Sequence, residues 1–141
     1  MLRSSDGVRS FGIRSIIEDK DGKFWICNTR YRFKVSPKNL PTNGLLNYKS
    51  EPGIKAYSED KDLIYFQSVI RGKEGDLWMM PWGGGVFRYD GKRVAHYSVK
   101  TGDKDAYMSS IYRDRKGDLW ICSQTGGPYK FDGKRFVPFV P

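Results

Sequence analysis

A tryptophan surrounded by apolar residues recurs three times in this chain of 141 residues. The surrounding sequences are KFWIC at residues 23–27, DLWMM at 76–80 and DLWIC at 118–122. The first two copies lie farther apart than the last two, because residues 36–65 carry extra length. A period of about 40 residues, close to the spacing of the last two copies, is typical of a four-stranded repeat with short turns. The chain is therefore expected to be built from three copies of one small unit.

Each copy divides into four short segments with the composition of β-strands. An apolar segment is followed by a turn that contains Gly22, Gly75 or Gly117, and then by the tryptophan segment. An aromatic segment comes next, and Asp-Gly at 90–91 or 132–133 leads to the fourth segment. Glycine adopts the positive φ that a two-residue hairpin requires. The copies therefore predict antiparallel meanders, in agreement with the scarcity of helix-forming residues.

The tryptophan segments are apolar at consecutive positions, as in Leu77-Trp78-Met79-Met80. A strand with one face in water alternates apolar and polar residues, because successive side chains point to opposite faces. A continuously apolar strand needs cover on both faces, and meanders stacked around an axis provide it. The segments therefore predict β-propeller blades, with Trp25, Trp78 and Trp120 packed between blades.

The repeat also resembles a known family. Its pattern is Ile-x-x-Asp-x-x-Gly-x-Leu-Trp-Ile, followed by Gly-Gly and by aromatic-x-Tyr/Phe-Asp-Gly. This pattern is similar to the two-component-regulator propeller repeat of bacterial hybrid histidine kinases and related regulators. Residues 69–97 and 111–139 carry it along most of their length, and the first copy carries it only over 16–27. The resemblance implies a sensor-type β-propeller whose binding sites lie on its loops.

We predict an all-β chain of three four-stranded blades. Residues 12–65 form blade 1 with a long insertion, 66–107 form blade 2, and 108–141 form blade 3. Residues 1–11 resemble the last strand of a preceding blade. Propeller rings usually contain four to eight blades, and an open blade face would expose apolar side chains to water. We therefore expect a homo-oligomer, most simply a homodimer that forms one six-bladed ring. The alternative is a piece of a longer propeller.

Ligand binding is predicted at residues that break the repeat in or next to the loops between the second and third segments. These residues are Trp82, Arg30, Tyr31, Gln124 and Thr125. Trp82 precedes three glycines, which allow close approach of a backbone. That loop joins two strands and lacks the Gly-Lys-Ser/Thr ending of a phosphate-binding P-loop, so a tight turn is the favoured interpretation.

The formal charge of +9 favours anionic partners in general. Gly-Lys-Arg follows each second turn, and Lys92, Arg93, Lys134 and Arg135 are expected to form a basic rim for an anionic partner. Charges that block aggregation at a sheet edge are the competing interpretation. A nucleic-acid-binding protein is a less favoured alternative, since it would need aromatic side chains along a basic groove.

The expected function is a non-enzymatic binding or sensor module for a small ligand, a glycan or a protein. A lyase or hydrolase is the alternative, because the streptogramin-inactivating lyases also have propeller repeats. His96 is the only histidine and is expected at the surface of an outer segment. The carboxylates are expected to form turns, and no pair is placed as acid and base. We predict no catalytic residue, metal ligand or cofactor.

Cys27 and Cys122 occupy equivalent positions two residues after a tryptophan. Both are expected to be reduced and buried, since cysteines in separate blades lie too far apart for a disulfide. Residues 1–6 do not resemble a signal peptide, and no apolar run is long enough for a membrane span. The chain is therefore expected to be soluble. The compartment stays open, because the missing signal favours the cytoplasm and the family resemblance favours the bacterial periplasm or exterior.

Overall fold

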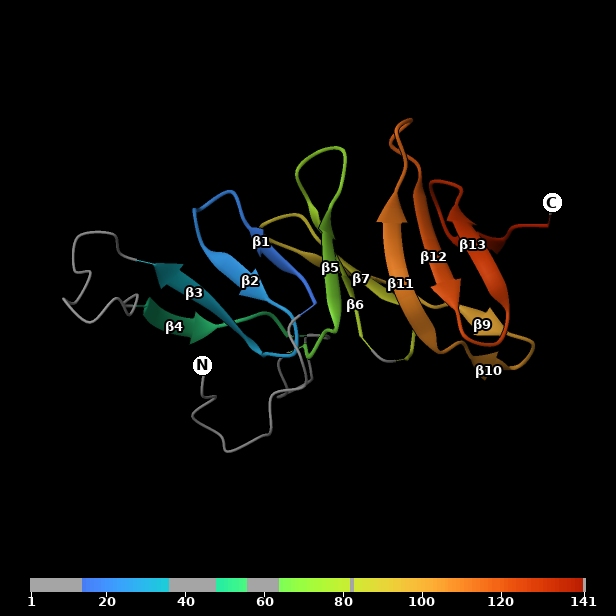
Figure 1. The fold of residues 1–141 in the computed structure, drawn as a ribbon, viewed down its shortest axis with the longest axis horizontal. Helices are drawn as coiled ribbons and strands as arrows, with labels where there is room; N and C mark the ends of the chain where they lie inside the picture. Colours follow the sequence, from blue (N-terminus) through green and yellow to red (C-terminus); the bar gives the residue numbers. More distant parts are fainter. Residues whose placement is uncertain (1–13, 36–47, 56–63, 82, 141) are drawn as a thin grey trace.

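The computed structural model describes residues 14–35, 48–55, 64–81 and 83–140, and these residues contain strands and turns but no helix. They form three four-stranded antiparallel sheets and one short hairpin (Figure 1). Blade 1 contains β1 (Ile16–Glu18), β2 (Phe24–Ile26), β3 (Tyr31–Val35) and β4 (Tyr48–Pro52). Blade 2 contains β5 (Ser68–Arg71), β6 (Leu77–Met80), β7 (Val86–Tyr89) and β8 (Val94–Tyr97). Blade 3 contains β11 (Met108–Arg113), β12 (Leu119–Ser123), β13 (Gly127–Phe131) and β14 (Phe136–Pro138).

Within every blade the strands lie in chain order, so each blade is a simple meander. Blade 2 lies between blades 1 and 3, as Figure 1 shows. The first strands of the blades, β1, β5 and β11, are the parts of neighbouring blades that approach one another most closely. Meanders that meet along their first strands are the arrangement of a β-propeller. The predicted all-β propeller fold is confirmed.

Two hydrophobic clusters hold the blades together, one at each junction. Leu77 and Met79 of β6 belong to the cluster between blades 1 and 2, together with Trp25. Trp78 and Met80 belong to the cluster between blades 2 and 3. All four residues of β6 are buried, which confirms that this strand is covered on both faces.

Trp25 and Trp78 each face the blade that follows in the chain, and Trp120 lies on the equivalent side of blade 3. Trp25 is 1% exposed and Trp78 is 3% exposed, so their predicted packing between blades is confirmed. Trp120 is only partly buried, because it lies on the side of blade 3 that faces away from blade 2. The expectation that Trp120 also packs between blades is wrong for the described residues, since none of them forms a blade beyond it.

The turn between the first two strands is longer than the sequence suggested. Gly22, Gly75 and Gly117 do adopt positive φ values of 70°, 80° and 89°. However, the N–H of Asp19 donates to the carbonyl of Lys23 at 2.8 Å, which leaves three residues in the loop instead of the expected two. A three-residue loop also needs a left-handed residue at its end, so glycine is required in either case.

The connection between blades 2 and 3 contains a hairpin that the sequence reading did not anticipate. It consists of β9 (Lys100–Thr101) and β10 (Lys104–Asp105). The proposed strand remnant at residues 1–11 lies outside the described residues. Nowhere in the described ranges is there a helical segment with the length and apolarity that a bilayer crossing requires.

Candidate functional site

The blades present two opposite edges, which we name by their connections. The turn edge carries the turns after the first strand of each blade and after the third strands of blades 2 and 3, and the former are at the top of Figure 1. The loop edge carries the loops between the second and third strands, including residues 27–30, 83–85 and 124–126. Residues 64–67 and 106–107, which lead into β5 and β11, reach the same edge. Four of the five predicted ligand-binding residues, Arg30, Tyr31, Gln124 and Thr125, therefore lie in or next to the described loops of this edge.

Two tyrosines occupy the same repeat position where the chain enters a first strand. Tyr65 precedes β5 and Tyr107 precedes β11, with the same spacing in sequence that separates Trp78 from Trp120. The residues on both sides of each tyrosine are buried. These flanking residues anchor the entry segment and direct both tyrosines out of the core at the loop edge.

The two tyrosines differ in what covers the ring. The guanidinium carbon of Arg30, in the loop of blade 1, lies 5.9 Å from the ring centroid of Tyr65. Gly83 is the equivalent residue in the loop of blade 2, and a Cβ there would lie 3.9 Å from two ring atoms of Tyr107. Burial raises the pKa of the Tyr65 phenol above its ordinary value, although Arg30 opposes the effect. Tyr107 is 62% exposed, because glycine provides no side chain to cover it.

The structure brings two of the predicted residues to these tyrosines. Arg30 covers Tyr65, and the backbone N–H of Gln124 donates to the carbonyl of Tyr107 at 2.9 Å. Thr125 is exposed on the same loop as Gln124, and Tyr31 is half-buried at the start of β3. Trp82 lies outside the described residues. Because Arg30 and Tyr31 belong to blade 1 and the other two to blade 3, they form no single cluster.

Tyr65 and Tyr107 were missed by the sequence reading. Alignment of the chain on its repeated tryptophans places both tyrosines at the same repeat position, and this position could have identified them. They were overlooked because the residues around them, Ile64-Tyr65-Phe66 and Ala106-Tyr107-Met108, are not similar in sequence. Only their alternating burial is shared, and burial is visible only in the structure.

A second repeated feature is an aspartate that binds the indole of its own blade. The Trp25 Nε1–H donates to Asp19 Oδ2 at 2.8 Å, and the Trp120 Nε1–H donates to Asp114 Oδ2 at 3.0 Å. The other carboxylate oxygen of each aspartate accepts two backbone N–H groups of the turn, as predicted for turn-forming carboxylates. The hydrogen bond from Trp120 is the main cause of a lowered pKa at Asp114.

Each tryptophan is also paired with a cation on the third strand. Arg32, Arg88 and Lys130 are the cross-strand partners of Trp25, Trp78 and Trp120, respectively. The Arg88 guanidinium and the Lys130 ammonium lie 5.4 Å from the rings of their tryptophans. Such contacts add attraction between the cation and the ring face. A carboxylate of the turn holds each cation, through contacts of Arg32 with Asp19, Arg88 with Asp76 and Lys130 with Asp118.

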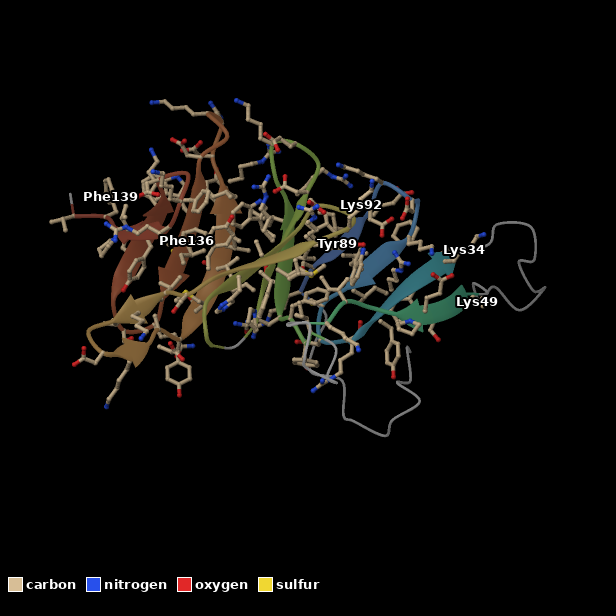
Figure 2. All side chains as sticks on the ribbon, turned by 180° about the vertical axis from the view of Figure 1, so that it is seen from behind. Lys34, Lys49, Tyr89, Lys92, Phe136 and Phe139 are labelled. Carbon is tan, nitrogen blue, oxygen red and sulfur yellow. The ribbon has the colours of Figure 1, made fainter. Side chains whose placement is uncertain are left out.

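The four residues of the predicted basic rim lie on the turn edge, away from the tyrosines. All four are exposed, and Figure 2 shows Lys92 at this edge. The backbone N–H groups of Arg93 and Lys92 donate to Asp90 Oδ1 at 2.7 and 2.8 Å, and these bonds lower the pKa of Asp90. Arg135 and Lys134 do the same with Asp132. The rim and the predicted ligand-binding loops are therefore two separate surfaces.

A cleft of about 390 Å³ opens between blades 2 and 3 on the turn edge. It is lined by Lys73, Glu74, Asp76, Trp78, Arg88, Gly117, Asp118, Leu119, Phe131, Asp132 and Gly133. Its carboxylates are already engaged by cations or by backbone N–H groups. Among the described residues, no group of three or more potential ligands could hold a metal ion. The cleft is therefore a weaker candidate than the loop edge.

His96 is half-buried and not at the open surface as expected. Its Nε2 forms a hydrogen bond with the carbonyl of Gly84, and its ring lies 4.7 Å from that of Phe87. The cysteines are free thiols. Cys27 is buried, and its Sγ accepts the N–H groups of Arg14 and Ser15 at 2.9 and 3.1 Å. Cys122 is exposed, contrary to expectation, because it shares the outer face of blade 3 with Trp120.

Comparison with known proteins agrees with this geometry. Residues 102–125, which contain β10, β11 and β12, match the family model of the two component regulator propeller. This stretch is similar to a two component regulator propeller repeat. The sequence of the whole chain has no significant match among curated proteins.

Solved propeller structures are similar to nearly the whole of this chain. Catalytically inactive virginiamycin B lyase from Staphylococcus aureus, determined with quinupristin, matches with 13% identity and a TM-score of 0.57. The match covers 92% of this chain and 41% of the lyase. The extracellular domain of the one component system BT4673 from B. thetaiotaomicron matches with 19% identity and a TM-score of 0.57. That match covers 92% of this chain and 17% of the other. The chain thus spans less than half the length of either protein, and at these identities the likeness shows the fold.

Proposed function

We propose that this chain is a non-enzymatic recognition module that binds a ligand at its loop edge, with the ring of Tyr107 as the central contact. The observation that carries the proposal is the difference between the two equivalent tyrosines. Arg30 covers Tyr65, and the equivalent ring of Tyr107 is 62% exposed over Gly83. A ligand that stacks on Tyr107 takes the place that a side chain fills one blade earlier.

The chemistry of the site suggests which ligands to test. An open tyrosine face attracts cations and also packs against flat apolar surfaces such as those of sugar rings. At the equivalent site one blade earlier, the guanidinium of Arg30 lies over the ring of Tyr65. Gln124 and Thr125 provide exposed polar side chains on the next loop. We therefore propose a small molecule, a glycan or a protein loop that carries a cation or a sugar ring.

The resemblance to sensor-type propeller repeats supports a recognition role. The extracellular domain of a one component system has the same fold, and that of a lyase does as well. His96 is engaged by a backbone carbonyl and by Phe87, which disfavours its use as a general base. Recognition is therefore the function that we propose. Detection of catalytic turnover by the chain would replace this proposal.

A screen followed by calorimetry tests the proposal. Glycans, guanidinium and ammonium compounds, nucleotides and short DNA are screened at low and high salt, and hits are titrated against three variants. Tyr107→Ala and Gly83→Arg should each weaken binding at least tenfold, because the first removes the ring and the second covers it. Gly83→Ala is the matched control and should retain binding, since its Cβ lies at ordinary contact distance from Tyr107. A ligand whose affinity is the same for all variants would refute the site. Strongly salt-dependent DNA binding would indicate the basic alternative.

A further inference from the structure

The outer face of blade 3 has the composition of a blade junction but no blade against it among the described residues. Tyr112, Trp120 and Cys122 share this face according to the strand register. Tyr112 is 60% exposed, and Phe139, whose ring centroid lies 5.1 Å from that of Trp120, is 45% exposed. Figure 2 shows Phe139 at the end of the molecule, beyond the sheet of blade 3. We call this surface the Trp120 face.

The two internal junctions show what covers such a face. Trp25 packs against Tyr89 of blade 2 with 5.9 Å between ring centroids, and Trp78 packs against Phe131 of blade 3 at 5.0 Å. The aliphatic residues at the equivalent position to Tyr112, Ile17 and Ile70, pack on the clusters of the following blade. The occupant of the Trp120 face is therefore another blade that presents apolar side chains on its first three strands.

A basic side chain in the first turn of one blade also lies against the first turn of the following blade. The side chain of Lys20 on blade 1 lies 3.1 Å from the position of a Cβ on Gly75 of blade 2. Lys73 of blade 2 lies 3.6 Å from the equivalent position on Gly117 of blade 3. Arg115 is the equivalent residue on blade 3, and it is exposed. Blade 3 thus presents both the apolar and the basic part of a junction to a following blade.

Blade 1 has an open area with the complementary character. Ile16 is 58% exposed, whereas the equivalent residues Val69 and Ile111 are 4% and 7% exposed in their junctions. Phe24 lies on the same face and is half-buried. On the same face, Ile26, the cross-strand partner of Ile16, and Phe33 on β3 are buried. The open area therefore follows β1 and the start of β2, where neighbouring blades approach most closely.

We propose that a second copy of this chain covers the Trp120 face, with Tyr112 and Trp120 of one copy against Ile16 and Phe24 of the other. Both halves of a junction are present on one chain, so two copies related by a two-fold axis form two identical junctions with each other. The result is one ring of six blades, a number within the usual range. The proposal does not depend on ligand binding at Tyr107.

Light scattering after size-exclusion chromatography tests this arrangement. The unmodified chain should have the mass of two chains of 16.3 kDa each. Tyr112→Glu and Ile16→Glu should each be monomeric, because each variant lacks one half of every junction. An equimolar mixture of the two variants should regain a dimer. The Ile16→Glu chain still carries an intact Trp120 face, and the Tyr112→Glu chain still carries an intact Ile16 surface.

The control is Tyr107→Glu, which replaces an equally exposed tyrosine at the loop edge and should stay dimeric. Circular dichroism establishes that the variants are folded, and Cys122→Glu replaces Tyr112→Glu if that variant is not. A monomer at every concentration up to about 100 µM would overturn the proposal. So would a mass above two chains, a dimeric Ile16→Glu variant, or a mixture that stays monomeric. A dimeric Ile16→Glu would instead indicate two Trp120 faces packed on each other.

Discussion

The side chain of Asp76 fills the space in front of Gly72. A Cβ on Gly72 would overlap Asp76 Oδ1 and would lie 2.7 Å from Trp78 Nε1. In blades 1 and 3 the position of Gly72 is occupied by Asp19 and Asp114, which bind the indole directly. Blade 2 therefore has no carboxylate at the position of Asp19 and Asp114, and the carboxylate of Asp76, from a later position in the same turn, occupies the space beside it.

This exchange predicts a specific coupling between the two positions. Gly72→Asp alone should destabilise the chain by about 1–3 kcal/mol, because two carboxylates compete for one space beside Trp78. Asp76→Lys alone should also destabilise it, since Arg88 loses its carboxylate partner. The double variant reproduces the Asp19 and Lys23 pair of blade 1 and should recover part of the loss. Urea unfolding of all four chains measures the coupling energy. Additive effects would contradict this account.

The turn carboxylates predict a loss of stability in acid. The hydrogen bonds at Asp90, Asp114 and Asp132 lower the pKa of each below its ordinary value of 3.8. In the unfolded chain these carboxyl groups have their ordinary pKa values, so the unfolded chain binds more protons than the folded chain as the pH falls below about 4. The stabilisation is therefore complete above that pH and is lost as the pH falls through the lowered native values.

The measurement is the free energy of unfolding between about pH 6 and pH 2. Asp114→Asn should make the acid-dependent part shallower, because its amide does not titrate. Asp103→Asn, in an exposed turn, serves as the matched control. A variant with the original slope would show that Asp114 does not contribute.

Equivalent tryptophans should have different importance for stability. Trp78→Ala leaves a cavity inside a junction and should cost about 3–5 kcal/mol. Trp120→Ala should cost less than half as much in dilute solution, because its ring is partly exposed within one chain. Thermal or urea unfolding gives both values, and Phe variants serve if Trp78→Ala does not fold. Equal costs would show that the open face of blade 3 is covered within the monomer.

The two thiols should differ in reactivity. Cys122 is exposed, and Cys27 is fully buried with two backbone N–H groups directed at its sulfur. Iodoacetamide should therefore label one cysteine in the native chain and both after denaturation, as measured by mass spectrometry with peptide mapping. If two copies associate through the Trp120 face, labelling of Cys122 should slow as the protein concentration rises. Native labelling of Cys27 would contradict its packing.

The fold could be predicted because its determinants are local and repeated. A continuously apolar strand needs two covered faces, and β6 has both. The glycine turns follow from the positive φ that their loops require. Burial at the end of the array could not be predicted in this way, because Trp25 and Trp120 have the same local sequence pattern. Their exposure depends on which blade follows them in space.

The candidate site was only partly predictable for a related reason. Two residues that break the repeat, Arg30 and Gln124, lie at the loop edge and contact the tyrosines there. The decisive feature, however, is a residue with no side chain. Gly83 matters because it lies opposite the Tyr107 ring, which the segment leading into the next blade contributes. The sequence around Gly83 contains no sign of this distant contact.

The forward orientation of every tryptophan makes the array polar, with a distinct leading and trailing surface. Trp25 and Trp78 each meet the apolar face of the next sheet, so both described junctions follow one matching rule. Duplication of one whole repeat would therefore create a new junction without altering the existing ones. Loss of part of a repeat would leave mismatched surfaces. Such a chain can change its length over evolution in complete units and still keep every interior contact.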